Sequence, residues 1–579
     1  MYLGINLSHG SSACLVDAQG NLISAIEEER ISRTKNHYGF PTEAVRYLIR
    51  NCPPNLEVQE VIHGAFQQLP EDSLVRILVN DGENPSNPRG SWKLPRPGWK
   101  RPDGSPHKLI ETIIDGQLRE LGMAPKKHIW IQHHDAHLGT ALASSLRSNQ
   151  QKSLLITLDG EGDGESGTVA VSSGSKFERL AKSSNLDSLG YLYQAVTEKY
   201  NFKGNQHEGK ITGLAAFGKS SEAVDILKKY IVVENGLVKI QYSKSLTQNR
   251  LTRALKQIGM STKTAASIEE IIDLSAASTK NYEDLAFAIQ EVLEDTVVEI
   301  LQYWMKRTDL RSLSVAGGVF ANVKLNQRIS EIRNLDFFDI FPNMGDGGLS
   351  AGGVWSHLSR TNNLRSKKPY SDMYLADQED NVKMYFHRTD LKFEEFQQDA
   401  LAIKVAELIA AGKFVGLHYG KMEFGPRALG HRSLLLDPRD KSILKSANDR
   451  LRRTEFMPFA PVVNERYFSR YFEGDLAKHP GFEFMTITCN VRSEVKGLIP
   501  AVTHIDGTAR PQVLESSMNE LYSRVLERFG DITGVHVLVN TSLNVHETPI
   551  NFNLKDSLKC LSDHAIDFIA TDKYLISLK

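Results

Sequence analysis

Two stretches of the chain share one alternation of apolar and polar residues. Residues 2–29 predict a strand, a polar loop, a second strand, a tight turn and a third strand, in the order YLGINL, SHGSS, ACLVDA, QGN and LISAIEE. Residues 153–182 repeat this order with SLLITLDG, EGDGESG, TVAVSS, a Gly-Ser turn and KFERLAK. β-Branched residues, alternation and Gly/Asn turns favour the strand assignments. The repetition predicts an internal duplication, with two unrelated hairpins as the alternative.

Helical periodicity is clearest in residues 281–306, where apolar positions recur on one face opposite a charged face. A strand with the sequence SLSVAGG follows this helix. Residues 358–386 are polar and predict a linker, and regular patterns resume near residue 395. We therefore expect an α/β protein with its main domain boundary between residues 370 and 400.

Residues 84–106 form an insert rich in proline, with Trp92, Trp99 and several basic residues. That much proline excludes regular helix or strand. An ordered surface loop is the simpler interpretation. A lid or acceptor-recognition loop is the alternative, because tryptophan and arginine suit sugars and anions.

Composition limits the classes of partner. The 579 residues carry a formal net charge of −1, so no overall charge attracts the chain to nucleic acid or to an anionic membrane. No apolar run approaches the length of about 18 residues that spans a bilayer. The start shows no signal-peptide pattern, and the four cysteines are scattered without CxxC spacing. We expect a cytoplasmic protein of two to four domains.

A histidine cluster follows the predicted strand HIWIQ. His133 and His137 are four residues apart and share one face of a helix, the spacing of two ligands to one first-row metal. The alternative is a set of polar histidines at a helix start. The best candidates for further ligands are Asp159, which ends the predicted strand LLITLD, and Asp346, which lies in the glycine-rich segment 342–348. Two imidazoles and two carboxylates suit Fe(II), Mn(II) or Zn(II).

Glycine-rich segments form a second set. Residues 159–164 and residues 316–322 each lie at the end of a predicted strand, and Glu208-Gly209-Lys210 adds a cation beside a turn of small residues. Glycine lets the backbone approach phosphates, and its N–H groups bind anions. Three such loops in one domain favour a nucleotide site, although each alone is commonly a turn.

Basic residues form a third set in the last third of the chain. Arg427 and Arg432 lie among apolar and glycine residues, which indicates partial burial beside a counter-anion. Arg450 and Arg453 could belong to a solvated face. Arginine with Ser and Asn side chains suits bidentate binding of phosphate and carboxylate.

The motifs together resemble a known family. They are SHGSSACLV, EEERISRTK, HHDAH, LDGEGDG, EGKITGLAAFG, AGGVFAN, GDGGLSAGG, MEFGPRALGHRS, FMPFAP, HIDGTARPQ and NTSLN. On these residues the chain is similar, over essentially its whole length, to the O-carbamoyltransferases of antibiotic and nodulation-factor biosynthesis, of the NodU, CmcH and TobZ type.

The resemblance implies two domains and a connecting segment. Residues 1–375 would form a duplicated, actin-like ATPase (ASKHA) domain related to the tRNA threonylcarbamoyl transferases. Residues 376–398 would connect it to a YrdC-like α/β domain at 399–579. The second domain would make carbamoyl-adenylate from carbamoyl phosphate and ATP, and the first would transfer the carbamoyl group to a hydroxyl of a small-molecule acceptor.

The resemblance also implies roles for single residues. His9 matches the general base, and Lys35 matches a lysine that contacts the activated carbamoyl group or phosphate. The metal ligands, for iron in related proteins, would be His133, His137, Asp159 and Asp346. The nucleotide-facing residues would be Gly162, Asp163, Lys210, Gly317, Gly318 and Asn322. The adenylation site would comprise Arg427, Arg432, Arg452, Met485, Arg510, Asn540 and Ser542.

Two positions depart from the family pattern. The family often has lysine where Arg452 stands, and arginine where Met457 stands. A phosphate contact is then lost, or Arg453 supplies it.

The expected partners are therefore ATP with Mg²⁺, carbamoyl phosphate and an alcohol such as a sugar or natural product, with Fe²⁺ or another divalent first-row ion as cofactor. A homodimer is compatible with such a chain. The alternatives are a tRNA-modifying threonylcarbamoyl-type transferase, which the balanced charge disfavours, and an actin-like sugar kinase, which needs no arginine-rich second half.

Overall fold

The structure is a computed structural model. It describes residues 1–51, 58, 60–64, 108–123, 127–241, 264–377, 381–453, 459–515 and 520–579. The insert at 84–106 and Met457 lie outside the described residues, and the expectations about them stay predictions.

A five-stranded sheet opens the chain, in the strand order β3-β2-β1-β4-β5. The first three strands are antiparallel, and β4 and β5 run parallel to β1. Short helices join or cover these strands. The elements are β1 (Tyr2–Asn6), β2 (Ser12–Val16), β3 (Leu22–Glu27), α1 (Glu28–Ser32), α2 (Thr42–Arg50), β4 (Glu60–His63), α4 (Lys108–Glu120) and β5 (Lys127–Trp130).

A second five-stranded sheet has the same connectivity, in the order β8-β7-β6-β11-β12. Strands β6, β7 and β8 are antiparallel, and β11 and β12 run parallel to β6. Its strands are β6 (Lys152–Gly162), β7 (Glu165–Ser173), β8 (Lys176–Ser184), β11 (Ser312–Ala316) and β12 (Phe337–Ile340). The predicted strands and their repetition are confirmed, and the chain is a mixed α/β protein.

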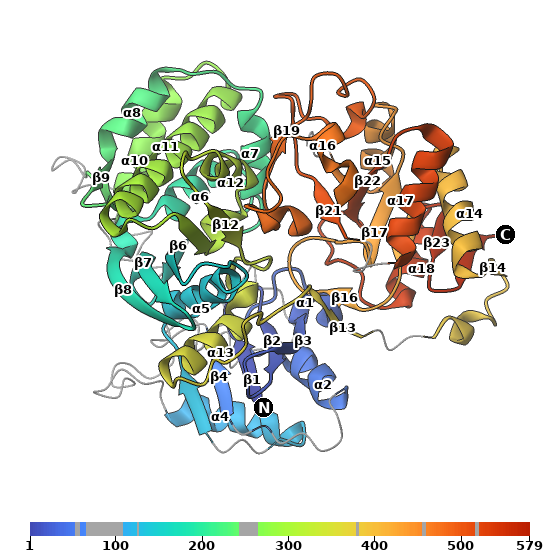
Figure 1. Ribbon diagram of the computed structural model, residues 1–579, viewed down its shortest axis with the longest axis horizontal. Helices are drawn as coiled ribbons and strands as arrows, with labels where there is room; N and C mark the ends of the chain where they lie inside the picture. The colour runs from blue at the N-terminus through green and yellow to red at the C-terminus, as the bar shows by residue number, and fades with distance from the viewer. Residues whose placement is uncertain are drawn as a thin grey trace.

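Helices fill the connection between β8 and β11 and form the upper left lobe of Figure 1. The predicted helix at 281–306 is α11, Tyr282–Thr308, the longest in this lobe. The other elements of this connection are α6 (Leu189–Lys199), α7 (Glu208–Ala215), α8 (Glu222–Tyr230), β9 (Ile231–Glu234), β10 (Leu237–Ile240) and α10 (Thr264–Ala277). Helix α12 (Val323–Ser330) lies between β11 and β12.

Two buried helices join the two sheets. Helix α5 (His133–Ser145) follows β5 and packs on β6 and β11, whereas α13 (Leu349–Arg360) follows β12 and packs on β1 and β4. The helices touch through glycines, since a Cβ on Gly139 would lie 2.0 Å from the Gly352 carbonyl oxygen. Each helix thus packs on the sheet that it does not follow, and this brings the N-termini of both helices between the sheets, below the centre of Figure 1.

The last third of the chain folds around an eight-stranded mixed sheet, at the right of Figure 1. The strand order is β14-β24-β23-β15-β17-β22-β18-β21. The strands are β14 (Leu391–Glu395), β15 (Val415–His418), β17 (Arg432–Leu436), β18 (Ala460–Asn464), β21 (Gln512–Leu514), β22 (Val537–Ser542), β23 (Phe568–Ala570) and β24 (Tyr574–Leu578). The helices are α14 (Gln398–Ala410), α15 (Ile443–Arg450), α16 (Phe468–Tyr471), α17 (Glu520–Thr533) and α18 (Leu554–Ser562).

The segment between the sheets is partly regular. Strand β14 is an edge strand of the eight-stranded sheet, although it lies inside the range expected to connect the domains. Strand β13 (Tyr374–Ala376) pairs with β16 (Met422–Glu423), so the chain before the connection contacts the chain after it. A further small pair is β19 (Cys489–Asn490) with β20 (Thr508–Ala509).

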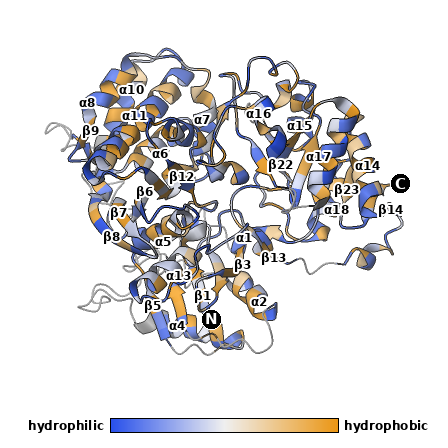
Figure 2. Ribbon diagram, in the orientation of Figure 1, coloured by the Kyte–Doolittle hydropathy of each residue, from blue (hydrophilic) through white to orange (hydrophobic). Residues whose placement is uncertain are grey.

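Hydropathy follows these layers. Figure 2 shows helices such as α11 and α17 with hydrophobic and hydrophilic residues on different faces, as expected for helices that cover a core. None of the described helices is long and apolar enough to cross a bilayer.

Arg147, just after α5, ties the first part of the chain to the last. Its guanidinium donates to Asp339 Oδ2 at 3.2 Å and to Glu483 Oε2 at 2.7 Å, and all three side chains are largely buried. Burial raises the pKa of Asp339 even beside this arginine. The pairing therefore offsets the cost of burying the two carboxylates.

Replacing Arg147 by methionine should lower the free energy of unfolding by about 3 kcal/mol, because two buried carboxylates lose their counter-charge. Chemical denaturation measures this loss. Lys199→Met removes a lysine from an exposed pair with Asp273 and should change stability by less than about 0.5 kcal/mol. Equal losses of stability from the two changes would contradict the role of Arg147 as the counter-charge of Asp339 and Glu483.

Candidate functional site

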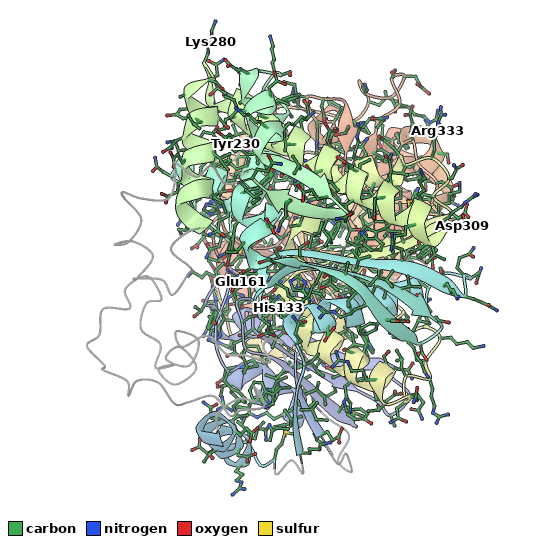
Figure 3. The ribbon with its side chains drawn as sticks, turned by 90° about the vertical axis from the view of Figure 1, so that its left-hand side faces the viewer. His133, Glu161, Tyr230, Lys280, Asp309 and Arg333 are labelled. Carbon is green, nitrogen blue, oxygen red and sulfur yellow. The ribbon has the colours of Figure 1, made fainter. Side chains whose placement is uncertain are left out.

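The four predicted metal ligands meet between the two five-stranded sheets. His133 and His137 lie on the first turns of α5, Asp159 lies near the end of β6, and Asp346 begins the short turn before α13. One ligand atom from each residue lies within 4.8 Å of those of the other three. Figure 3 shows His133 near Glu161 at the end of the second sheet, while Lys280 and Arg333 lie on the outer surface.

The distances are those of a compact cluster. Asp159 Oδ2 lies 2.8 Å from His137 Nε2 and 3.5 Å from His133 Nε2. Asp346 Oδ1 lies 3.6 Å from each of these nitrogens. All four side chains are buried or nearly so.

Charge in the cluster favours a cation. Burial alone would raise the pKa of Asp159, but hydrogen bonds from His133 and His137 hold it well below its usual value. Burial alone would lower the pKa of His133, but Asp346 and Asp159 raise it to about 9. Two imidazoles and two carboxylates at this spacing fit the donor set of a divalent first-row ion.

The adjacent backbone is shaped around the cluster. A Cβ on Gly162 would lie 2.0 Å from His133 Cγ, so only glycine fits there. Asp163, at φ 54°, accepts the His133 backbone N–H at 2.8 Å and thereby holds the start of α5. A Cβ on Gly318 would lie 2.9 Å from Asp159 Oδ1. These three residues were expected to face a nucleotide, and that role stays a prediction; in the structure they border His133 and Asp159.

Three other residues of the expected nucleotide set serve local contacts. Gly317, at φ 106°, lies against the Leu158 carbonyl, where a Cβ would approach to 2.1 Å. The Asn322 side chain caps α12 by accepting the Leu325 N–H at 3.0 Å. Lys210 is buried with its ammonium 5.2 Å from the Phe202 ring centroid. Their nucleotide role stays a prediction.

His9 stands beside the cluster. Its Nδ1 lies 3.4 Å from Asp346 Oδ2, and its side chain is 43% exposed. Ser8 donates to the same carboxylate oxygen at 2.7 Å, and Asn6 donates to the Asp346 carbonyl at 2.7 Å. The loop after β1 therefore holds Asp346 firmly and leaves His9 accessible.

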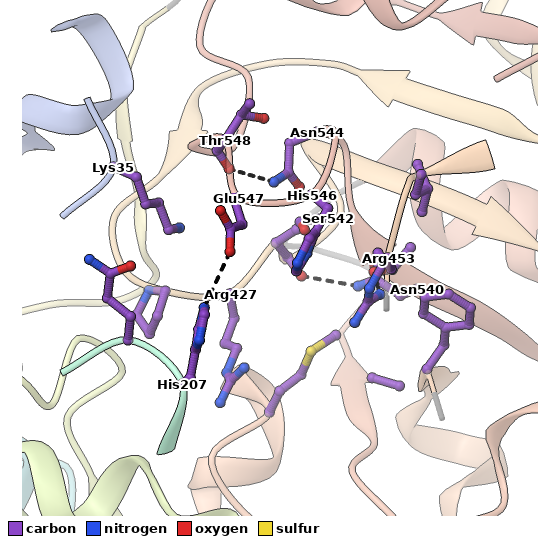
Figure 4. Close-up of a pocket in the computed structure, with 18 of the residues that line it drawn as sticks. Lys35, His207, Arg427, Arg453, Asn540, Ser542, Asn544, His546, Glu547 and Thr548 are labelled. Carbon is purple, nitrogen blue, oxygen red and sulfur yellow. Dashed lines mark hydrogen bonds and ion pairs between the residues drawn. The ribbon is translucent and has the colours of Figure 1, made fainter. Parts of the chain in front are cut away.

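A cavity of about 660 Å³ lies where the last third of the chain meets the first. The predicted residues that line it are Lys35, Arg427, Met485, Arg510, Asn540 and Ser542. The other residues around it are Thr34, Lys203, Gln206, His207, Pro426, Ala428, Leu451, Arg453, Phe459, Ala460, Thr541, Asn544, His546, Glu547 and Thr548. Figure 4 shows Arg427, Arg453, Asn540 and Ser542 around this space.

The arginines of this cavity repel one another. Burial lowers the pKa of Arg427 to about 10. Burial, together with the charges of Arg427 and Arg453, lowers the pKa of Arg510 well below its usual value. Within the described part of the chain, neither Arg427 nor Arg510 has a carboxylate at ion-pair distance, and the Nε of each is buried without a hydrogen-bond partner. The arrangement favours an anionic ligand.

Backbone hydrogen bonds hold Arg427 in place. Glu423 Oε1 accepts the backbone N–H groups of Leu429 and His431, each at 2.8 Å, which closes the turn after Arg427. Asn540 donates to the Ala428 carbonyl at 3.1 Å and to Gln512 at 2.8 Å. The expected adenylation residue Asn540 thus also shapes the turn.

Two expected members of the arginine set lie elsewhere. Arg452 is exposed at φ 56° just after α15, and Arg453 lines the cavity in its place, with its guanidinium 4.8 Å from the Phe459 ring centroid. Arg432 is fully buried, but it donates to the carbonyls of Tyr419, His431 and Phe552. Arg432 therefore holds loops together and does not reach the cavity.

Sequence patterns did not single out the cavity residues Lys203, His207 and Glu547. The first two precede the EGK motif, and Glu547 follows NTSLN. Their closeness to these motifs could have indicated a role at a site, but the motifs do not predict that two segments about 340 residues apart are in contact.

A buried ion cluster on α1 lies between the two sites. Arg30 donates to Glu27, contacts Glu29 Oε1 at 3.0 Å and donates to the Gly425 carbonyl at 2.7 Å. Glu27 in turn accepts from Asn343 at 3.1 Å, three residues before Asp346. Glu29 lies 3.6 Å from Lys35 of the cavity. One guanidinium is thus linked to the loops of both sites.

Two family models match the chain. "Carbamoyltransferase N-terminus" matches residues 107–354, and "Carbamoyltransferase C-terminus" matches residues 406–578.

Relatives of known name agree with these matches. Nodulation protein NolNO of Sinorhizobium fredii is 30% identical over 578 residues, which cover 98% of this chain and 79% of that protein. The 3'-hydroxymethylcephem-O-carbamoyltransferase of Streptomyces clavuligerus is 27% identical over 58% of each chain. Among solved structures, HypF of T. kodakarensis matches 46% of this chain and 40% of its own, with 16% identity and a TM-score of 0.30.

Proposed function

The chain belongs to the carbamoyltransferase family, and from that premise we propose that it is an ATP-dependent O-carbamoyltransferase. It would activate the carbamoyl group of carbamoyl phosphate as carbamoyl-adenylate and transfer it to a hydroxyl of a small-molecule acceptor, a sugar or another natural product. The observation that carries this proposal is the pair of sites, one lined by arginines and one by histidines and carboxylates.

The activation step would occur in the arginine-lined cavity. Carbamoyl phosphate would lose phosphate to water, and an oxygen of the resulting carbamate would attack the α-phosphorus of ATP, with pyrophosphate as the leaving group. Arg427, Arg453 and Arg510 would neutralise the charge that develops on the phosphates, helped by Mg²⁺ bound to ATP. Ser542 and Asn540 would position the nucleotide by hydrogen bonds.

The delivery step would occur at the histidine–carboxylate cluster. His133, His137, Asp159 and Asp346 would hold a divalent first-row ion, with Fe²⁺ the expected one. When bound, such an ion would supply positive charge toward the carbonyl or phosphate oxygens of the adenylate. The chain's own side chains would hold the acceptor and adenylate close together and exclude water from a hydrolysable intermediate.

His9 would act as the general base in this step. Its position beside Asp346 and its exposed ring suit an imidazole that takes the proton of the acceptor hydroxyl as the new C–O bond forms. AMP would then leave from the carbonyl carbon, and the carbamate ester would be the product.

The fold supports the assignment of the activation step and the delivery step to two different domains. The repeated strand order of the first two sheets is what an actin-like, duplicated domain over residues 1–375 predicts. The eight-stranded sheet is compatible with a YrdC-like domain over residues 399–579. We propose these domain identities together with the function.

The direct test is incubation with ATP, carbamoyl phosphate and a panel of alcohols, including sugars and aminoglycosides, followed by mass spectrometry. We expect one alcohol to gain a carbamoyl group and ATP to yield AMP and pyrophosphate. Formation of ADP and a phosphate ester would instead identify a kinase, and label from carbamoyl phosphate in tRNA would identify a tRNA-modifying enzyme.

Replacing His9 by asparagine should lower the rate of transfer by about 100-fold or more and leave pyrophosphate release near the wild-type rate. The reason is that His9 borders the cluster and does not line the arginine cavity. Product formation and pyrophosphate release are followed in the same samples. An equal loss of both rates would exclude the general-base role.

A further inference from the structure

One side of the arginine cavity carries an ion pair between distant parts of the chain. Lys203 and His207 belong to the loop between α6 and α7, and Glu547 belongs to the turn after β22. Lys203 Nζ lies 3.3 Å from Glu547 Oε2, and His207 Nε2 lies 3.6 Å from Glu547 Oε1. Figure 4 shows Glu547 between Lys35 and His207, across the cavity from Arg453 and Asn540.

His207 is arranged as a donor toward this position. Its Nδ1 accepts the Lys203 backbone N–H at 3.1 Å. A neutral ring therefore carries its proton on Nε2, the nitrogen that faces Glu547. His207 can then donate to an anion whether or not the ring is charged, and it also stands at the N-terminus of α7, where negative charge is favoured.

Glu547 differs in charge from the other ionised side chains that line the cavity. Five cationic side chains line the described cavity, from Lys35, Lys203, Arg427, Arg453 and Arg510, and Glu547 is the only carboxylate among its described lining residues. Glu547 also adopts φ 61°, in the left-handed region that a glutamate seldom occupies. A carboxylate at this place therefore calls for a functional explanation.

A structural role for the Glu547 contact is weak. Lys203 and Glu547 are each about half exposed, and exposed ion pairs contribute little to stability. The base of the same turn is held by Arg33, which donates to the carbonyls of Pro549 and Ile550, each at 2.9 Å. The tip is held as well, because the His546 N–H donates to the Leu451 carbonyl at 3.0 Å and Asn544 donates to the Thr548 carbonyl at 2.6 Å. The Glu547 side chain can therefore leave its two partners without a change in the backbone of the turn.

We propose that Lys203 and His207 form a phosphate-binding subsite of the cavity, which the Glu547 carboxylate occupies until a phosphoryl group of the substrate displaces it. A phosphoryl group carries more negative charge and more acceptor oxygens than one carboxylate, so it binds these donors more strongly. The proposal rests on the proposed function for the nature of the ligand. The phosphoryl group belongs either to ATP or to carbamoyl phosphate.

Binding titrations with the full-length protein test the subsite and distinguish the two sources. The probes are α,β-methylene-ATP with Mg²⁺, AMP, and phosphonoacetamide as a stable analogue of carbamoyl phosphate. The variants are Glu547→Gln, Lys203→Gln and, as a control, Lys228→Gln, which removes a partly exposed lysine that pairs with Glu291 and Asp295 and does not line the cavity.

We expect Glu547→Gln to bind the phosphoryl probe about threefold to tenfold more tightly, because the competing carboxylate is gone, and Lys203→Gln to bind it about tenfold more weakly. Lys228→Gln should bind like the wild type. A response of α,β-methylene-ATP without a response of AMP places a β- or γ-phosphate in the subsite. A response of phosphonoacetamide alone places carbamoyl phosphate there.

Unchanged or weaker binding by Glu547→Gln would overturn the proposal, as would wild-type binding by Lys203→Gln. Either result leaves the proposed function intact if the wild type binds the probes. A wild-type protein that binds none of the three probes would contradict the proposed function itself.

Discussion

Replacing Arg510 by alanine should lower the rate of carbamoyl-phosphate-dependent pyrophosphate release by about 10³-fold. The variant should be at least as resistant to heat as the wild type. The two expectations have one cause. Arg510 lies against Arg427 and Arg453 without a neighbouring carboxylate in the described structure, so its charge raises the energy of the empty cavity. The same charge stabilises the phosphates when they bind.

A fluorimetric pyrophosphate assay and a thermal melt measure these effects on one preparation. Arg452→Gln is the matched control, because the structure places this neighbouring arginine outside the cavity. Its rate of pyrophosphate release should match the wild type. A strongly destabilised Arg510→Ala variant, or one that still releases pyrophosphate, would refute the role of Arg510 as a site for ligand charge.

Replacing His137 by glutamine should reduce the bound metal from about one ion per chain to almost none. Loss of one of four ligands weakens binding by more than about 100-fold, since the loss of an outer hydrogen bond alone weakens it tenfold to 100-fold. Elemental analysis after growth with iron, manganese and zinc, followed by dialysis, gives the metal content and identity without an activity assay.

The adjacent histidine provides the control. His134 is also buried, but its ring is bonded to Thr157 Oγ1 at 2.8 Å and to the Glu165 carbonyl at 3.1 Å. His134→Gln should therefore retain its metal. Equal metal loss from both variants would indicate a general disturbance of α5 and not the loss of a ligand.

The secondary structure around both sites was predictable because its signals are local. Alternating residues in 2–29 and 153–182 predicted the three antiparallel strands of each sheet, and four-residue spacing placed His133 and His137 on one helix face. Asp159 and Asp346 were predictable as partners because one lies near the end of a strand and the other begins a turn, where polar groups of different segments gather.

The arginine cavity was harder to predict, for two physical reasons. A left-handed residue at the end of α15 decides whether Arg452 or Arg453 points inward, and residue type does not reveal such a conformation. Arg432 resembles a ligand-binding arginine in sequence, but its Nε and Nη1 donate to the carbonyls of Tyr419, His431 and Phe552. Contacts such as Lys203 with Glu547 depend on the packing of whole domains, which no local pattern encodes.

The ion cluster around Arg30 limits how this enzyme can be re-engineered. Chimeras that exchange acceptor specificity would most simply be cut near residue 375, between the first two sheets and the third. Such a breakpoint separates Arg30 from the native Gly425 carbonyl, and it pairs a buried charge with a foreign loop. Grafted halves will work together only if the donor sequences agree at residues 27–35 and around Gly425, so these two segments have to be exchanged as a unit.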